Sequence, residues 1–116
     1  MIGMVNYSRL FEKFKEKGIT TYTIRQKALI PQSTLTKFNM CSVNEKERSK
    51  YVNKSDEEII NLKLEEYKNS HGSEFKTDVS TKTIEELCQL LQCQPQEIME
   101  WKVDLKPELA YENKYQ

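Results

Sequence analysis

The sequence predicts a small, all-α fold, and three observations lead to that prediction. In residues 19–38, the apolar residues are spaced as in two short helices that are joined by a tight turn. Apolar residues also recur at helical spacing in segments on both sides of this stretch. The chain has 116 residues, of which 37% are hydrophobic, so it has room for one domain with a small core. We expect a single domain over residues 1–102, with an inserted segment at 41–78 that carries one helix, and a C-terminal tail at 103–116.

The first forty residues predict three helices. Asn6 or Ser8 caps the first helix, which runs to about Lys17 and stops at Gly18. The second begins at Thr20 or Thr21 and runs to about Ala28, and Leu29 and Ile30 form the turn. Pro31 suits the first position of the third helix, which ends near Asn39. The residues expected to pack inside this unit are Leu10, Phe11, Phe14, Ile24, Ala28, Ile30, Leu35 and Phe38.

The rest of the chain predicts three more helices. Ser55 followed by Glu58 is a capping-box signature, and it opens a helix from Asp56 to about Lys68. Ser80 caps another helix with a broad apolar face, and Pro95 precedes a last short helix from Gln96 to about Trp101. Residues 42–54 show no clear period, and the polar tail is open to being a strand or an extended arm.

Charge is distributed unevenly along a chain whose formal net charge is zero. Residues 1–40 carry seven basic and two acidic side chains, residues 41–78 carry seven and nine, and residues 79–116 carry four and seven. The positive field therefore lies on the segment with the paired helices. Because phosphate attraction is local, a neutral total is compatible with nucleic-acid binding.

The third helix leaves a polar face outward, formed by Gln32, Ser33, Thr34, Thr36 and Lys37. A helix-turn-helix presents side chains in this way to the DNA major groove. Glutamine pairs with adenine, lysine reaches guanine or phosphate, and serine and threonine serve either base. The alternative is a solvated helix face.

Two runs of the chain resemble the lambda-repressor/Cro type of helix-turn-helix regulator, also called XRE-like, in a small bacterial or phage branch. Residues 17–35 (KGIT, IR, IPQSTL) are similar to one family run. Residues 79–100 (VSTKTIEELCQLLQC, then IME) are similar to another. The resemblance implies a five-helix DNA-binding domain and a homodimer. It departs at Leu29, where the family has glycine in the turn, and at the inserted segment 41–78.

The resemblance also implies which residues meet DNA. Thr21 lies where relatives contact a phosphate, and Gln32, Ser33 and Lys37 lie where relatives reach base edges, with Thr34 and Thr36 nearby. Tyr22 and Lys27 are candidates for the DNA backbone. For Arg25, DNA contact and an internal ion pair remain equal alternatives.

Other classes of function find little support in the sequence. One histidine and three glycines do not assemble a catalytic triad or a phosphate-cradling loop, so we expect no enzyme and no cofactor. We expect no metal site, and we read Cys88 and Cys93 as buried structural thiols because their spacing departs from the three-or-four rule for one helix face. No apolar run is long enough to cross a bilayer and no secretory signal is present, so we expect a cytoplasmic protein with reduced cysteines.

The function predicted from sequence is specific binding of double-stranded DNA in transcriptional regulation, most simply as a repressor. The alternative is a protein-interaction module, such as an antitoxin-like or inhibitory adaptor, that keeps the fold without specific DNA binding. The apolar stripe of residues 55–68 leaves three alternatives open, which are packing onto the same chain, a dimer contact and a surface for a protein partner.

Overall fold

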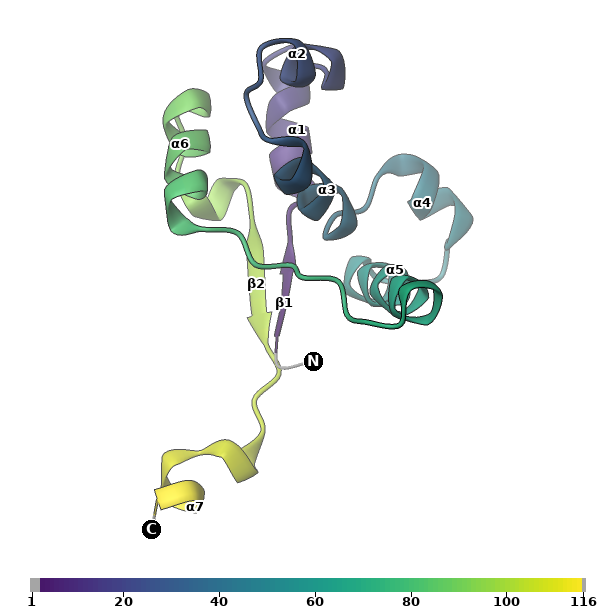
Figure 1. Cartoon of the computed structure of the whole chain (residues 1–116), viewed down its shortest axis with the longest axis vertical. Helices are drawn as coiled ribbons and strands as arrows, with labels where there is room; N and C mark the ends of the chain where they lie inside the picture. Colours follow the sequence, from purple (N-terminus) through teal and green to yellow (C-terminus); the bar gives the residue numbers. More distant parts are fainter. Residues whose placement is uncertain (1–2, 116) are drawn as a thin grey trace.

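A computed structural model describes residues 3–115 of the chain. The structure is mostly helical, as predicted, with two short strands and two 3-10 turns added (Figure 1). The α-helices are α1 (Ser8–Glu16), α2 (Thr21–Gln26), α3 (Gln32–Met40), α4 (Glu45–Lys50), α5 (Asp56–His71), α6 (Thr81–Leu91) and α7 (Tyr111–Tyr115). The strands are β1 (Gly3–Asn6) and β2 (Glu100–Val103), and the 3-10 turns are η1 (Pro95–Glu97) and η2 (Pro107–Leu109).

The chain reverses after α1 by a glycine turn, as the sequence predicts. Gly18 has φ +70°, a conformation that glycine adopts without strain. The amide of Ile19 donates to the carbonyl of Phe14 at 2.8 Å and that of Gly18 to Lys15 at 3.1 Å, which is the Schellman pattern. The side chain of Thr20 then accepts from the amide of Thr23 and caps α2.

The turn between α2 and α3 differs from expectation in one detail. The residue with a left-handed backbone is Ala28, with φ 51°. The resemblance to the helix-turn-helix family predicts the left-handed position at Leu29, where the family has glycine. The amide of Leu29 donates to the carbonyl of Ile24 at 3.0 Å, and its side chain packs against the core. The conformational strain of about 1 kcal/mol expected for a side chain in this region therefore belongs to Ala28.

The main core lies between α1, α2, α3 and α6. Phe14 on α1, Leu35 and Phe38 on α3 and Leu91 on α6 are at most 2% exposed. The ring of Tyr7 meets that of Phe38 edge-on, with centroids 4.6 Å apart. These contacts fix α3 with its apolar side inward, so its other side faces solvent.

The inserted segment holds two helices where one was predicted. Helix α4 was missed because its residues lack an apolar period, but Asn44 and Glu47 form a reciprocal capping box that starts it. Helix α5 is three residues longer than predicted and ends at Gly72, which has φ +75°.

The inserted helix α5 packs onto the body of the same chain, which is one of the three alternatives left open for its apolar stripe. Ile59 and Ile60 are fully buried with Val43 in a second small core, against which Met4 and Leu64 pack. Further along α5, the ring of Tyr67 stacks on that of His71, with centroids 3.8 Å apart.

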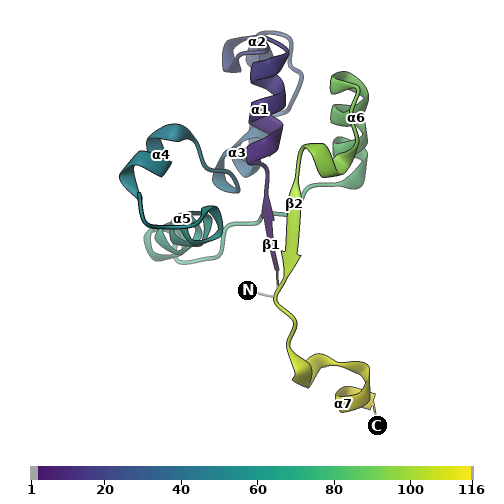
Figure 2. The same ribbon diagram turned by 180° about the vertical axis from the view of Figure 1, so that it is seen from behind.

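A two-stranded antiparallel ribbon joins the two ends of the domain (Figure 2). Gly3 pairs with Val103 and Asn6 with Glu100. The short helix predicted to run to Trp101 is wrong in its second half, because Glu100 and Trp101 belong to β2. Beyond the ribbon, the tail leads through η2 to α7 as an arm that points away from the body (Figure 1).

Candidate nucleic-acid interface

Helices α2 and α3 carry the polar residues that the sequence predicts to meet DNA. Thr21 and Tyr22 are exposed in the first turn of α2, and Tyr22 is 71% exposed. Gln32 and Ser33 are exposed in the first turn of α3. The opposite side of α3 is buried through Leu35 and Phe38, so packing fixes which residues of α3 face outward.

Two of the predicted residues are only half-exposed. Thr34 and Lys37 are intermediate in burial, while Thr36 is exposed. The hydroxyl of Thr36 donates to the carbonyl of Gln32 at 2.9 Å. Its proton is therefore used within α3, and its methyl group and oxygen lone pairs are what remain for a neighbour.

Lys37 is held by the far end of the inserted segment. Its Nζ donates to the backbone carbonyl of Asp78 at 2.7 Å and lies 3.7 Å from the Asp78 carboxylate. Asp78 itself is 87% exposed. Sequence reasoning missed this residue, since 41 positions separate it from Lys37 and no local pattern links them. To reach a base, Lys37 has to leave this carbonyl.

The basic side chains near α3 divide into free and paired groups. Within residues 3–115, no carboxylate lies within salt-bridge distance of Arg25 on α2, so the internal ion pair that was one alternative is not formed. Arg48 on α4, in contrast, binds Asp56 with both Nη2 and Nε, at 2.9 and 3.3 Å. These bonds, and the amide of Asn6 donating to the same carboxylate at 3.3 Å, hold the pKa of Asp56 below its ordinary value. Arg48 is thus engaged in structure.

Lys63 on α5 fastens the insertion to the end of α3. Its Nζ donates to the carbonyls of Asn39 and Ser42, at 2.8 and 2.9 Å, and lies 2.9 Å from the Glu47 carboxylate. The carbonyls at the end of a helix lack partners within the helix, and a lysine suits them. The inserted segment is therefore tied to α3 at two points, by Lys63 and by Lys37.

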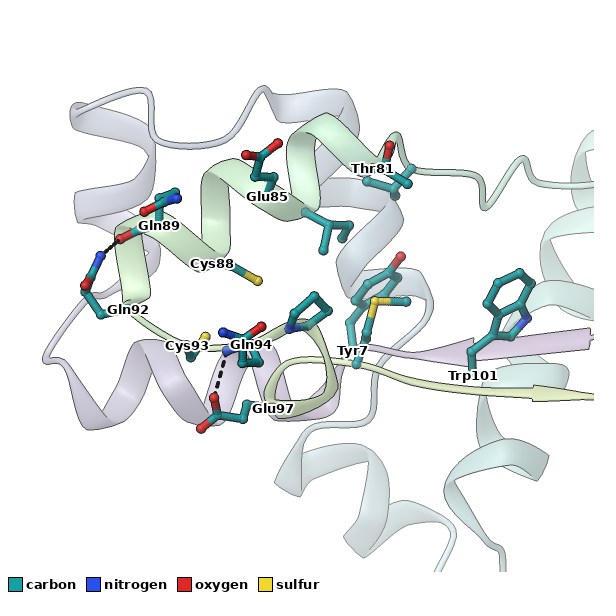
Figure 3. A pocket seen from close by; sticks show the side chains of 14 residues that line it. Tyr7, Thr81, Glu85, Cys88, Gln89, Gln92, Cys93, Gln94, Glu97 and Trp101 are labelled. Atoms are coloured by element: carbon teal, nitrogen blue, oxygen red, sulfur yellow. Dashed lines mark hydrogen bonds between the residues drawn. The ribbon is translucent and has the colours of Figure 1, made fainter.

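An open cavity lies beside α6. It has a volume of about 740 Å³ and lies between α6, η1 and the start of β2 (Figure 3). Its walls include Tyr7, whose pKa burial raises to about 12, and the thiols of Cys88 and Cys93. The residues predicted to meet DNA do not line this cavity.

One protein-family model matches the C-terminal part of the chain. Residues 69–104 match the model of the Cro/C1-type HTH DNA-binding domain. The match begins near the end of α5, includes α6, η1 and β2, and covers less than half of the chain. It supports the Cro/XRE-like helix-turn-helix family, with a lambda-repressor-like architecture, and a DNA-binding regulator in general. No curated protein and no solved structure matches the chain.

Among the described residues, no helix is long and apolar enough to cross a bilayer.

Proposed function

We propose that the chain is a sequence-specific, DNA-binding transcriptional regulator that acts as a repressor in the cytoplasm. The observation that carries the proposal is the outward face of α3, where Gln32 and Ser33 are exposed while Leu35 and Phe38 anchor the helix. In this proposal α3 enters the major groove, and Gln32, Ser33, Thr34, Thr36 and Lys37 lie along it.

Phosphate contacts complete the proposed interface. In this proposal Thr21 and Tyr22, exposed at the start of α2, contact phosphates, and the +5 balance of residues 1–40 supplies sequence-independent attraction. We also propose a homodimer, because two reading helices about 34 Å apart read adjacent major grooves on one face of DNA. In this proposal residues 1–102 act as one DNA-binding unit, and the arm at 103–116 contributes to the dimer.

Selection from a random DNA pool tests the proposal. The protein is titrated against randomised duplexes, and bound DNA is sequenced beside a Gln32→Ala/Lys37→Ala variant. We expect a palindromic site whose enrichment the variant loses. Gln89→Ala/Lys68→Ala is a matched control, since it removes one glutamine and one lysine from exposed positions outside α2, α3 and the arm. If a folded wild-type protein enriches no sequence at low salt, the regulator proposal is wrong.

A second candidate function is a protein-interaction module of the antitoxin-like or adaptor type. The attachment of Lys37 to Asp78 favours it, because this bond occupies a side chain that a DNA reader would use. The arm also carries exposed apolar side chains, with Leu105 84% and Tyr111 69% exposed. Salt separates the candidates, because DNA affinity falls steeply as salt rises and binding through an apolar surface does not.

A further inference from the structure

The turn that ends α6 brings two cysteines together that sequence spacing had set apart. Gln92 adopts a left-handed conformation with φ 53°, which reverses the chain. The amide of Cys93 then donates to the carbonyl of Cys88 at 3.0 Å, and the amide of Gln92 donates to that of Gln89 at 3.3 Å. This is again the Schellman pattern, in which the side chains of the first and last residues face each other. The three-or-four rule fails here because the chain leaves the helix between the two cysteines.

The backbone hydrogen bond limits how far apart the two cysteines can be. A carbonyl oxygen lies about 2.4 Å from its own Cα, and an amide nitrogen about 1.5 Å from its Cα. With an N···O distance of 3.0 Å, the two Cα atoms are at most about 7 Å apart. Cα atoms in disulfides are usually about 4.4–6.8 Å apart, so the backbone already holds the pair at the distance that a disulfide requires.

The positions of the two thiol groups agree with this short backbone distance. Both thiols line the open cavity beside α6 and are half-buried, so small solutes have access to them. Figure 3 shows them on adjacent segments at one end of this cavity. Burial, and then the neighbouring Cys93 thiol, raise the pKa of Cys88, which is consistent with two thiols in contact.

The third cysteine provides an internal contrast. Cys41 is 2% exposed in the main core, and burial raises its pKa to about 11. A thiol reacts only where reagents reach it, so burial protects Cys41, whereas the half-buried thiols of Cys88 and Cys93 remain accessible.

We propose that Cys88 and Cys93 form a modification site, a dithiol that a peroxide oxidises to an intramolecular disulfide. The thiolate of one cysteine attacks hydrogen peroxide, which breaks the O–O bond and leaves a sulfenic acid on the sulfur. The hydroxide that departs takes up a proton and becomes the first water. The second thiol attacks the sulfenic sulfur, the S–S bond forms and a second water is released. Both sulfurs are oxidised, and one peroxide is reduced to two waters. Disulfides of reducing compartments are typically transient and of this redox-sensing kind.

The disulfide would tie the last turn of α6 to the segment that leads through η1 into β2. Leu91 before this turn and Ile98 after it are both core residues, at most 1% exposed. In the reduced protein, backbone hydrogen bonds hold the turn. In the oxidised protein a covalent bond would hold it as well.

Mass spectrometry of the oxidised full chain tests this site without reference to DNA. Trypsin cleaves after Lys82 and Lys102, so Cys88 and Cys93 fall in one peptide, residues 83–102, while Cys41 falls in residues 38–46. After stoichiometric peroxide and alkylation, we expect peptide 83–102 to lose two hydrogen atoms and to resist alkylation. We expect Cys41 to be alkylated only after denaturation.

Three single variants complete the test. Cys88→Ser and Cys93→Ser should each abolish the loss of two hydrogens, while the matched control Cys41→Ser should keep it. The proposal is overturned if folded wild-type protein instead gives sulfinic acid at either position, a disulfide that involves Cys41, or cross-linked chains as the main product.

Discussion

At the scale of single residues, Asp78 is the least expected feature of the candidate interface. It ends the inserted segment, and its carbonyl and carboxylate both meet Lys37 on α3. In the proposed complex this carboxylate would lie near DNA phosphates and oppose binding. Asp78 would then lower affinity for every sequence, since repulsion of phosphates does not depend on the bases.

We expect Asp78→Ala to raise DNA affinity at low salt by about two- to tenfold, as removal of one repelling charge near phosphates would do. Fluorescence anisotropy over a series of salt concentrations measures this change. Glu66→Ala is the charge-matched control, because Glu66 is exposed on α5, outside the proposed interface and the arm. An equal gain in both variants would mean that only net charge matters and that Asp78 has no special place.

Asp56 gives a second prediction at this scale, through pH. Its folded pKa lies below the ordinary value because Arg48 and Asn6 donate hydrogen bonds to it. Such a group stabilises the fold above its unfolded pKa of about 4, and the contribution is lost as pH falls through the folded pKa.

Arg48→Met should therefore lower the free energy of unfolding near neutral pH by about 0.5–1 kcal/mol, a modest value because both side chains are partly exposed. The difference from wild type should shrink as pH falls from about 4 to about 2. Urea unfolding at several pH values measures it. A difference that stays constant over this range would show that the pair does not perturb Asp56.

At the scale of elements, helix boundaries follow from local chemistry. The capping box of α5 is reciprocal, since the hydroxyl of Ser55 accepts from the amide of Glu58 at 3.2 Å and the Glu58 carboxylate accepts from the amide of Ser55 at 3.3 Å. This signature was visible in the sequence. Strand β2 was not, because a four-residue strand has no stability of its own and needs β1 beside it.

Ser55→Ala should reduce stability by about 1 kcal/mol, the usual effect of losing a helix cap. Ser73→Ala is the control, since Ser73 is exposed in the loop after α5, and it should change stability by less than about 0.5 kcal/mol. Denaturant unfolding of both variants gives the comparison. Equal values for the two variants would show that α5 does not depend on its cap.

At the scale of the whole molecule, the inserted segment belongs to the folded body. Ile59 and Ile60 on α5 are fully buried, and Lys63 and Asp78 link the segment to α3. We therefore expect the insertion and the main core to unfold together.

Ile60→Ala should cost about 2–5 kcal/mol, as removal of a buried isoleucine side chain does in a packed core. It should lower the midpoint of one transition, seen both by circular dichroism and by the fluorescence of Trp101. Val52→Ala, at a position 79% exposed, should have almost no effect. An early, separate transition in Ile60→Ala would show that the insertion unfolds on its own.

The sequence by itself determined α1, α2, α3, α5 and α6 and the outward face of α3. Caps at Thr20, Ser55 and Ser80, the stop at Gly18 and the apolar period of each segment all act over a few residues, so they can be read locally. The identity of the proposed DNA-facing residues also came from the sequence, and it stays a prediction.

Only the tertiary structure decided what joins distant parts of the chain. Three contacts link residues that are 24 to 100 positions apart in the sequence. They are the pairing of β1 with β2, the bond between Lys37 and Asp78, and the contact of α5 with α3 through Lys63. Each depends on geometry set by the rest of the core, and no local pattern encodes it. Cys88 and Cys93 are close in sequence, but their contact depends on the left-handed conformation of Gln92. Glutamine rarely adopts this conformation, so the residue type does not predict it.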